Sequence, residues 1–393
     1  DDKVVIVSAK RTPIGSFQGN FESLKATELG SRVIEKNIND ISINPKEIDE
    51  TIMGCVLPAG LGQAPARQAA MGAGIPSESG ATTINKMCGS GMKSIMFGHD
   101  SIKAQQNNIV VAGGLENMTN APYILSKARK GFRMGHADVK DHMFLDGLED
   151  AYEEGKLMGS FAEDTAEHYQ FTREQQDNFA ITSLERAKKA NEDGTFESEI
   201  VPIKVLNRKN EIIINKDEQP FKSDITKIPT LKPAFKKNGT VTAANSSSIS
   251  DGASSVILML ESEAQKRGIK PLARIIDHST NSQEPKWFTT APIGAIEKVL
   301  EKSGWKKTDV DLFEVNEAFA VVPMAVMKDI GISNDILNIY GGACALGHPV
   351  GASGTRIVTT LINALKKNNL KKGVASLCIG GGEATALTLE IIN

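Results

Sequence analysis

Two segments, one in the first third of the chain and one near its end, show the same succession of glycines, helix and strand. They are GSGMKSIMFGHDSIKAQQNNIVVAGG (89–114) and GASGTRIVTTLINALKKNNLKKGVASLCIGG (351–381). In each, closely spaced glycines open a helix with a polar end, and a strand that finishes in glycines follows. Repetition at the scale of half a chain predicts a duplicated α/β core, with chance similarity of two unrelated α/β units as the alternative.

Strands and helices also alternate on both sides of the middle of the chain. Strand-like runs occupy 4–9, 50–57, 272–280, 310–316 and 384–392, and helical patterns occupy 26–39, 291–304 and 316–331. This alternation predicts parallel sheets covered by helices. From about 120 to 245 it lapses into helices and charged connectors. We interpret that region as an insertion carried by the first half, either a cover over a site or a solvated decoration.

Composition limits the kind of protein this can be. A chain of 393 residues is too long for one ordinary hydrophobic core. A formal net charge of -3 gives no reason to expect nucleic acid or an anionic membrane as a partner. No apolar run approaches the ~18 residues of a membrane span. The first residues, DDKVVIVSAK, do not resemble a secretory signal, so we expect a cytoplasmic protein.

The four cysteines show no C-x-x-C pair, so a metal-binding or disulfide role is not expected for them. Cys88 differs from the others because Gly-Ser-Gly and a helix follow it. The helix dipole and free backbone N–H groups there favour a thiolate nucleophile of lowered pKa. The alternative is a buried cysteine at a tight turn. We interpret Cys344 as a small packed residue.

Three further residues lie at predicted strand or helix ends. His348 sits among glycines in GGACALGHPVGASG, and Cys378 ends a strand that runs into three glycines. Asn316 follows another strand. Each has a structural alternative: a packed histidine, a buried strand cysteine and a helix cap. If the halves are duplicated, these residues and Cys88 meet at one site, where two thiols and an imidazole suit acyl transfer.

The motifs together resemble those of one family, the thiolases, and within it the acetyl-CoA acetyltransferases. The motifs are RTPIGSF, NKMCGSGMKS, AGGLENMTNAPY, NEAFA, GGACALGHPVGASGTR and CIGGGEA, in the order of that family and nearly end to end. The resemblance implies an α/β fold with a five-layered core of two duplicated βαβαβαββ halves. It assigns 1–119 to the N-terminal half, 120–245 to an inserted loop domain that binds substrate and CoA, 246–270 to the return, and 271–393 to the C-terminal half.

The resemblance also implies the reaction and the roles of five residues. Two acetyl-CoA would condense reversibly to acetoacetyl-CoA and CoA, with Cys88 carrying the acyl group. His348 would deprotonate Cys88 and then the thiol of CoA, and Cys378 would move the proton at the α-carbon of acetyl-CoA. Asn316, through a water, and His348 would form one oxyanion hole. The backbone N–H groups of Cys88 and Gly380 would form the other.

Substrate contacts follow from the same resemblance, with some departures. The implied contacts are Ser247, on the pantetheine of CoA, and Met158, Leu157, Lys222, Phe288 and Phe319. Leu157 replaces a histidine common in biosynthetic relatives, and Phe288 stands where many short-chain relatives have methionine. Lys222 is the candidate substitute for an arginine near the CoA nucleotide. Glu383 stands where many relatives have a small or apolar residue. These departures concern acyl-chain preference.

Three other functions compete with this one. A degradative 3-ketoacyl-CoA thiolase would act on longer chains. A decarboxylating ketoacyl synthase is disfavoured by Cys378, and a non-catalytic acyl-CoA-binding relative by Cys88, His348 and Cys378 together. The resemblance implies a homo-oligomer, a dimer or a tetramer, acting in fatty acid metabolism. It implies no metal and no cofactor, since the coenzyme A thioesters are substrates.

Overall fold

A computed structural model describes residues 2–393. Its main sheet follows the order β12-β13-β14-β11-β1-β10-β5-β3-β4, with β2 (Gly15–Ser16) beside β10. The first half contributes β1 (Val4–Arg11), β3 (Glu50–Gly54), β4 (Gly80–Ile84), β5 (Val110–Asn117) and β10 (Ser250–Leu260). The second half contributes β11 (Ala273–Ser282), β12 (Leu312–Val315), β13 (Lys372–Ile379) and β14 (Glu383–Ile391). The two halves join where β1 pairs with β11.

The strand pairings of one half are repeated in the other. β3 is parallel to β5 as β12 is to β13. β10 is antiparallel to β5 and β1, as β14 is to β13 and β11. β4 has its counterpart in a single parallel bridge between Phe313 and Leu337. Two unrelated units would not share this order, so the predicted duplication is confirmed.

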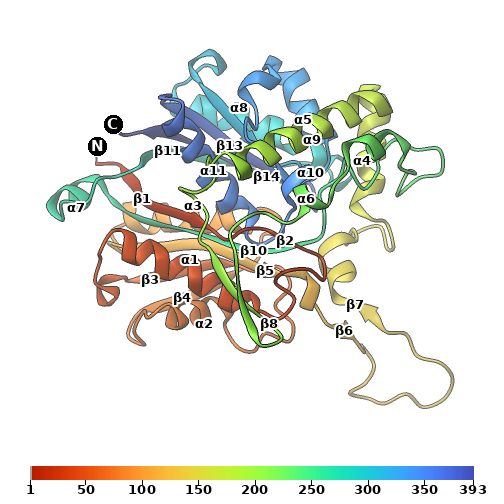
Figure 1. The fold of residues 1–393 in the computed structure, drawn as a ribbon, viewed down its shortest axis with the longest axis horizontal. Helices are drawn as coiled ribbons and strands as arrows, with labels where there is room; N and C mark the ends of the chain where they lie inside the picture. Colours follow the sequence, from red (N-terminus) through yellow and green to blue (C-terminus); the bar gives the residue numbers. More distant parts are fainter. Residues whose placement is uncertain (1) are drawn as a thin grey trace.

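Helices and sheets form five layers. The central layer holds α3 (Ser90–Lys103) and α11 (Ser353–Lys367); α1 (Ala26–Asp40) and α2 (Pro65–Gly72) cover the first outer face, and α8 (Ala291–Ser303) and α9 (Val321–Val326) the second. Figure 1 shows α3 and α11 between the strands of the two halves. Side chains alternate between layers because successive strand residues face opposite ways. On β1, Val4 and Ile6 pack in the central layer and Val5 and Val7 against α1.

The helix predicted over 316–331 is wrong at its start. Helical geometry begins only at Val321, and it continues through a π-helical turn to Gly331. The preceding backbone is held in other pairings. The N–H of Asn316 donates to Ser376 O on β13 at 3.0 Å, and the N–H of Ala320 to Asn245 O at 2.8 Å. These bonds hold the NEAFA segment in a non-helical path beside the sheet, so Asn316 does not cap the helix.

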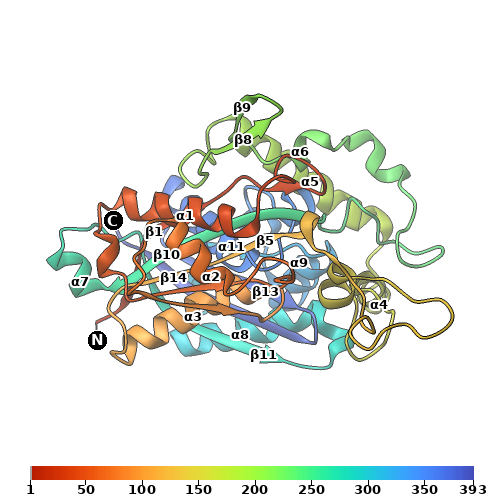
Figure 2. The same cartoon turned by 90° about the horizontal axis from the view of Figure 1, so that it is seen from below.

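The region between β5 and β10 carries elements outside the duplicated pattern. They are β6 (Tyr123–Ile124), β7 (Lys140–Asp141), α4 (Met158–Tyr169), α5 (Arg173–Glu192), β8 (Ile203–Asn207), β9 (Asn210–Ile214) and α6 (Gln219–Lys222). α4 packs its buried side chains against α9 and the short helical segment Pro285–Thr290. The β6–β7 arm, defined as residues 123–141, projects away from the rest of the molecule (Figures 1 and 2). The remaining short helices are α7 (Glu261–Lys266) and α10 (Ala343–Leu346).

Within residues 2–393, no helix combines the length and apolarity that a membrane crossing requires.

Candidate active site

Cys88 lies in the tight turn between β4 and α3, one residue before the helix cap Gly89. Met87 has a positive φ of 49°, which is uncommon for a residue with a side chain. Ser90 holds this turn: its Oγ accepts from the Lys86 N–H at 2.8 Å and donates to the Met87 carbonyl at 2.6 Å. A side chain at position 89 would meet Ile379 on β13 at 2.3 Å. The glycine therefore lets the Cys88 turn approach the second half closely.

The prediction of a lowered pKa for Cys88 is wrong in this structure. Burial raises the pKa of the Cys88 thiol from 9.0 to about 11, although backbone N–H groups of Gly380 and Cys88 itself oppose that rise. Glu116, which acts on the thiol through space, adds to the increase. Loss of solvation outweighs the helix terminus here. The resting Cys88 is a neutral thiol that needs a base when it reacts.

His348 is a neutral imidazole with a defined tautomer. Burial and the nearby Arg356 lower the pKa of His348 from 6.5 to about 3. Ser353 Oγ donates its hydrogen to Pro349 O at 3.1 Å, so it accepts from His348 Nδ1–H, which lies 2.5 Å away. The proton therefore sits on Nδ1, and Nε2 keeps a lone pair. That lone pair accepts a long hydrogen bond from Asn316 Nδ2 at 3.5 Å. His348 is thus arranged as a base.

Asn316 brings an unpaired polar atom to the same place. The side chain is 1 % exposed, and among residues 2–393 its Oδ1 has no hydrogen-bond partner. A buried amide oxygen without a partner is costly and calls for a water or ligand. The water that the family resemblance assigns to Asn316 would satisfy this atom.

Cys378 and Gly380 approach Cys88 from the end of β13. Cys378 is fully buried, and burial together with the nearby Cys88 raises its pKa well above 9.0. The backbone of Gly380 reaches the Cys88 thiol, as its effect on the thiol pKa shows. Lys86 Nζ and Glu383 Oε2, 2.8 Å apart, tie the two loops together. The structure therefore brings both thiols and the glycine loop to one junction.

The predicted substrate residues fall into two groups. Leu157 caps α4 and Met158 begins it, and Met158 Sδ lies 3.3 Å from the place a Gly380 side chain would occupy. Phe288 and Phe319 belong to the buried apolar cluster beside Cys378. The other two are polar. Ser247 donates its N–H to Ala318 O, and Lys222 is half exposed and pairs with Glu218 at 2.6 Å.

Two residues that lie within the quoted motifs, but to which no role was assigned from the sequence, also shape the site. Ser353 fixes the tautomer of His348. The sequence signal for it is that Ser353 lies five residues after His348, at the start of α11. Glu116 is fully buried and accepts from the N–H groups of Val56, Leu57 and Gly351 at 2.9, 3.2 and 3.2 Å. It lies in the AGGLENMTNAPY motif and anchors the loop that follows His348. Cys344 is buried, as predicted.

Comparison with known proteins agrees with this fold. Residues 4–262 match the family model described as "Thiolase, N-terminal domain", and residues 269–391 match "Thiolase, C-terminal domain". A Dictyostelium discoideum protein named "Probable acetyl-CoA acetyltransferase" is 50% identical over 99% of this chain and 94% of its own length.

Two solved structures are also similar. The Bacillus anthracis acetyl-CoA acetyltransferase has a TM-score of 0.97 at 40% identity, covering 100% of this chain and 99% of that one. A thiolase from Ascaris suum in complex with coenzyme A has a TM-score of 0.94 at 41% identity, covering 99% and 100%.

The fold and these matches define an enzyme of the transferase class. The chain belongs to the thiolase family, as its motifs predicted.

Proposed function

We propose that this chain is an acetyl-CoA C-acetyltransferase, which condenses two acetyl-CoA to acetoacetyl-CoA and CoA and catalyses the reverse thiolysis. The observations that carry the proposal are the unprotonated Nε2 of His348, held beside Asn316, and the nearness of Cys378 to Cys88. The names of the relatives above support the acetyl substrate over longer acyl chains.

In this proposal the first half-reaction loads Cys88. His348 Nε2 takes the thiol proton as the sulfur attacks the thioester carbonyl, and CoA leaves with that proton. Both groups are neutral at rest, so the proton moves during attack and not beforehand. The backbone N–H groups of Cys88 and Gly380 support the oxyanion on the carbonyl.

The second half-reaction forms the carbon–carbon bond. His348 Nε2 takes the proton of the Cys378 thiol, and the Cys378 thiolate takes a proton from the α-carbon of a second acetyl-CoA. The protonated His348 and an Asn316-bound water stabilise the resulting enolate. The enolate carbon attacks the acyl-Cys88 carbonyl, and the Cys88 sulfur leaves as His348 returns the proton to it. We propose that the pantetheine passes Ser247 and that Lys222 lies near the nucleotide. The segment 120–245 covers the substrate. The reaction uses no metal or cofactor.

Chain-length profiling of thiolysis tests this function. We expect the highest kcat/KM with acetoacetyl-CoA and lower values with longer 3-ketoacyl-CoAs. Equal or higher values with longer chains would favour the degradative alternative. Incubation with labelled acetyl-CoA followed by mass spectrometry should place the acetyl group on Cys88. Absence of any adduct would instead support a non-catalytic acyl-CoA-binding protein.

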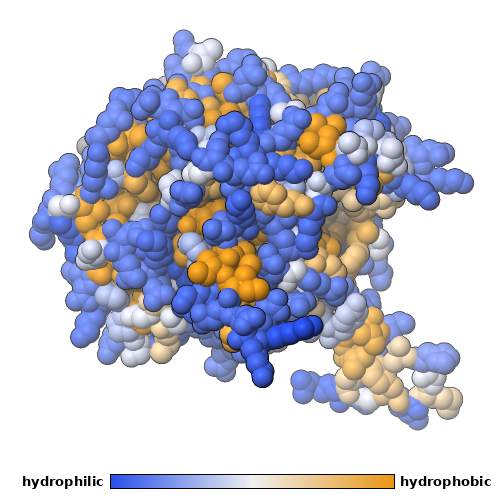
Figure 3. All heavy atoms as spheres, viewed as in Figure 1, coloured by the Kyte–Doolittle hydropathy of each residue, from blue (hydrophilic) through white to orange (hydrophobic). Residues whose placement is uncertain are grey.

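We also propose a homotetramer assembled as a dimer of dimers. β4 is an end strand that pairs only with β3 among residues 2–393, and such edges invite pairing with a second copy. Exposed apolar side chains lie on the β6–β7 arm (Figure 3), including Leu125, Phe132 and Met134. Light scattering should give a tetramer mass, and Phe132→Ser with Met134→Ser should shift it to a dimer.

For location, we propose the cytoplasm and a role in fatty acid metabolism. Cys55, Cys88, Cys344 and Cys378 are all free, which suits a reducing compartment.

A further inference from the structure

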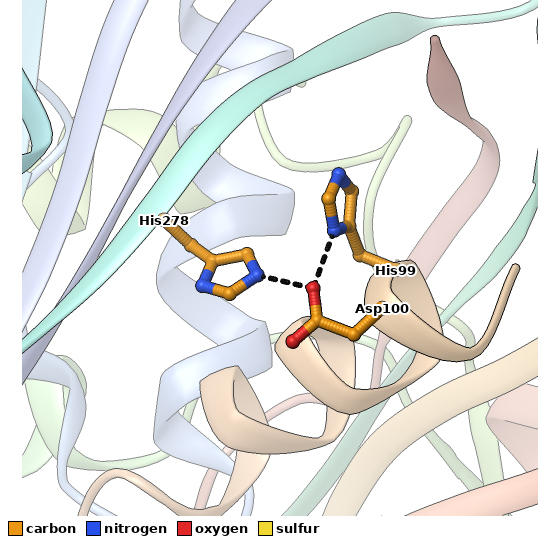
Figure 4. Close-up of side chains that lie close together, drawn as sticks. All are labelled: His99, Asp100 and His278. Atoms are coloured by element: carbon orange, nitrogen blue, oxygen red, sulfur yellow. Dashed lines mark hydrogen bonds and ion pairs between the residues drawn. The ribbon is translucent and has the colours of Figure 1, made fainter. Parts of the chain in front are cut away.

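Two histidines and one aspartate meet outside the active site, where α3 passes β11. His99 and Asp100 lie in the C-terminal part of α3, and His278 lies on β11 in the other half of the molecule. Figure 4 shows both imidazole rings turned toward the Asp100 carboxylate. His278 and Asp100 are 178 residues apart in the chain. Only the folded protein brings the three together.

The spacing of their polar atoms suits a metal ion. Asp100 Oδ1 lies 2.7 Å from His278 Nε2 and 2.9 Å from His99 Nδ1. One ligand atom from each residue lies within 4.8 Å of the others. In a tetrahedral zinc site, bonds of ~2.0–2.1 Å separate ligand atoms by roughly 3.4 Å. Movements of about half an ångström would replace the two hydrogen bonds by three metal bonds.

The surroundings allow an ion to enter. The side chains of His99 and His278 are 16% and 15% exposed, so their rings are held by packing, and that of Asp100 is 56% exposed. The rings lie 5.1 Å apart at 89°, so they approach a common point from different directions. Imidazole nitrogen selects zinc and similar ions over magnesium and calcium, which prefer oxygen ligands.

We propose that His99, Asp100 and His278 form a zinc-binding site separate from the reaction. The sequence predicted no metal ligands, and no short motif could signal this set. A bound ion would join α3, from the first half, to β11, from the second. It would stabilise the folded enzyme by binding that state and not the unfolded chain.

The test uses the full chain with Cys88 alkylated by iodoacetamide, so that the reactive thiol does not take the ion. Zinc chloride is titrated against a chromophoric chelator, with His278→Gln and His99→Gln compared with the wild type. His136→Gln, on the exposed β6–β7 arm, is the matched control. We expect one zinc per chain in the wild type and the control. Each cluster variant should bind roughly tenfold more weakly or worse, since even outer-shell changes cost that much.

Thermal unfolding in EDTA and in zinc provides a second measurement on the same proteins. Zinc should raise the unfolding temperature of the wild type and of His136→Gln, and at the same concentration it should raise that of the cluster variants less. Similar unfolding temperatures in EDTA would show that the variants are folded. Wild-type protein that binds no zinc, or His278→Gln that binds it as tightly as the wild type, would overturn the proposal.

Discussion

The two halves of the molecule place polar or thiol side chains at the ends of corresponding strands. Those side chains bond to each other in the first half but not in the second. Directly after β3 comes Cys55, and directly after β12 comes Asn316; the next-to-last residue of β5 is Glu116, and that of β13 is Cys378. In the first half the two groups bond to each other, with Cys55 Sγ 3.4 Å from Glu116 Oε2. In the second half, Asn316 Oδ1 has no partner among the described residues.

This difference shows how a duplicated fold separates support from chemistry. Glu116 satisfies its oxygens with backbone N–H groups, including that of Gly351 in the opposite half, so it holds the His348 loop in place. In the second half, Asn316 Oδ1 has no partner among the described residues, and His348 Nε2 is unprotonated and holds only a long bond to Asn316 Nδ2. Buried polar groups with all their hydrogen bonds made stabilise the fold. Buried polar groups without a partner are retained where they serve a reaction. The first half adds Cys88, on a turn that the second half contacts.

The largest effect should come from Cys88→Ser, which removes the nucleophile that both halves serve. We expect activity to fall roughly 10⁴-fold or more, because a serine hydroxyl is much less acidic than a thiol. Rates of thiolysis and of acetyl exchange between acetyl-CoA and a CoA analogue should fall together. A variant that kept more than about a tenth of the wild-type rate would exclude Cys88 as the nucleophile.

The sharpest comparison pairs Cys378→Ala with Cys55→Ala, one strand end from each half. Cys378→Ala should slow thiolysis of acetoacetyl-CoA by ~10²–10⁴-fold, the usual cost of losing a general acid or base, while acetyl exchange stays largely intact. Cys55→Ala should change both rates little and lower stability instead. Equal loss of both activities in Cys378→Ala would mean that Cys378 acts on site structure, and the division between the halves would fail.

A smaller effect is expected from Ser353→Ala, which removes the acceptor for His348 Nδ1–H. The ring would lose the bond that fixes its tautomer. We expect about a 10- to 100-fold loss, less than the ~10⁴-fold found when a buried carboxylate partner is changed in a serine protease triad. Ser353→Thr keeps the hydroxyl and should restore most activity. Steady-state kinetics of both variants measure this effect. A Ser353→Thr variant as inactive as Ser353→Ala would contradict the role of the Ser353 hydroxyl.

The smallest effect concerns Glu116 and stability. Burial raises the pKa of Glu116 from its ordinary 4.5 to about 7 in the folded chain. The folded state therefore binds this proton more tightly than the unfolded state. The contribution of this proton to the free energy of unfolding is fully present below pH 4.5 and is lost as the pH rises through about 7. It amounts to about 3 kcal/mol at most.

Urea unfolding of the wild type and Glu116→Gln between pH 4.5 and 8 measures that contribution. The free energy of unfolding should fall with rising pH more steeply in the wild type than in Glu116→Gln, whose amide does not titrate. The variant should also be less stable overall, because its amide nitrogen faces backbone N–H donors. Parallel pH profiles would show that Glu116 stays ionised and that its hydrogen bonds outweigh burial.

Local sequence patterns determined most of the fold. Alternating strands and helices, and the repeated glycine–helix–strand segments, predicted a duplicated α/β core, because each pattern reports which face of its own element is buried. The five layers were implied by the family resemblance. The motifs around Cys88, His348, Asn316 and Cys378 predicted the family, because the backbone turns that hold these residues are encoded within a few neighbouring residues.

Only the tertiary structure decided properties that depend on distant groups. The Cys88 pKa rises because the whole fold removes water from the thiol, an effect that a local helix terminus does not outweigh. The His348 tautomer depends on where Ser353 places its hydroxyl, and the start of α9 on backbone pairing with β13 and Asn245. His99 and His278 also meet only because the fold brings α3 and β11, which are distant in the chain, side by side. Solvation and long-range pairing are set by what surrounds a residue in space, and its neighbours along the chain do not report that.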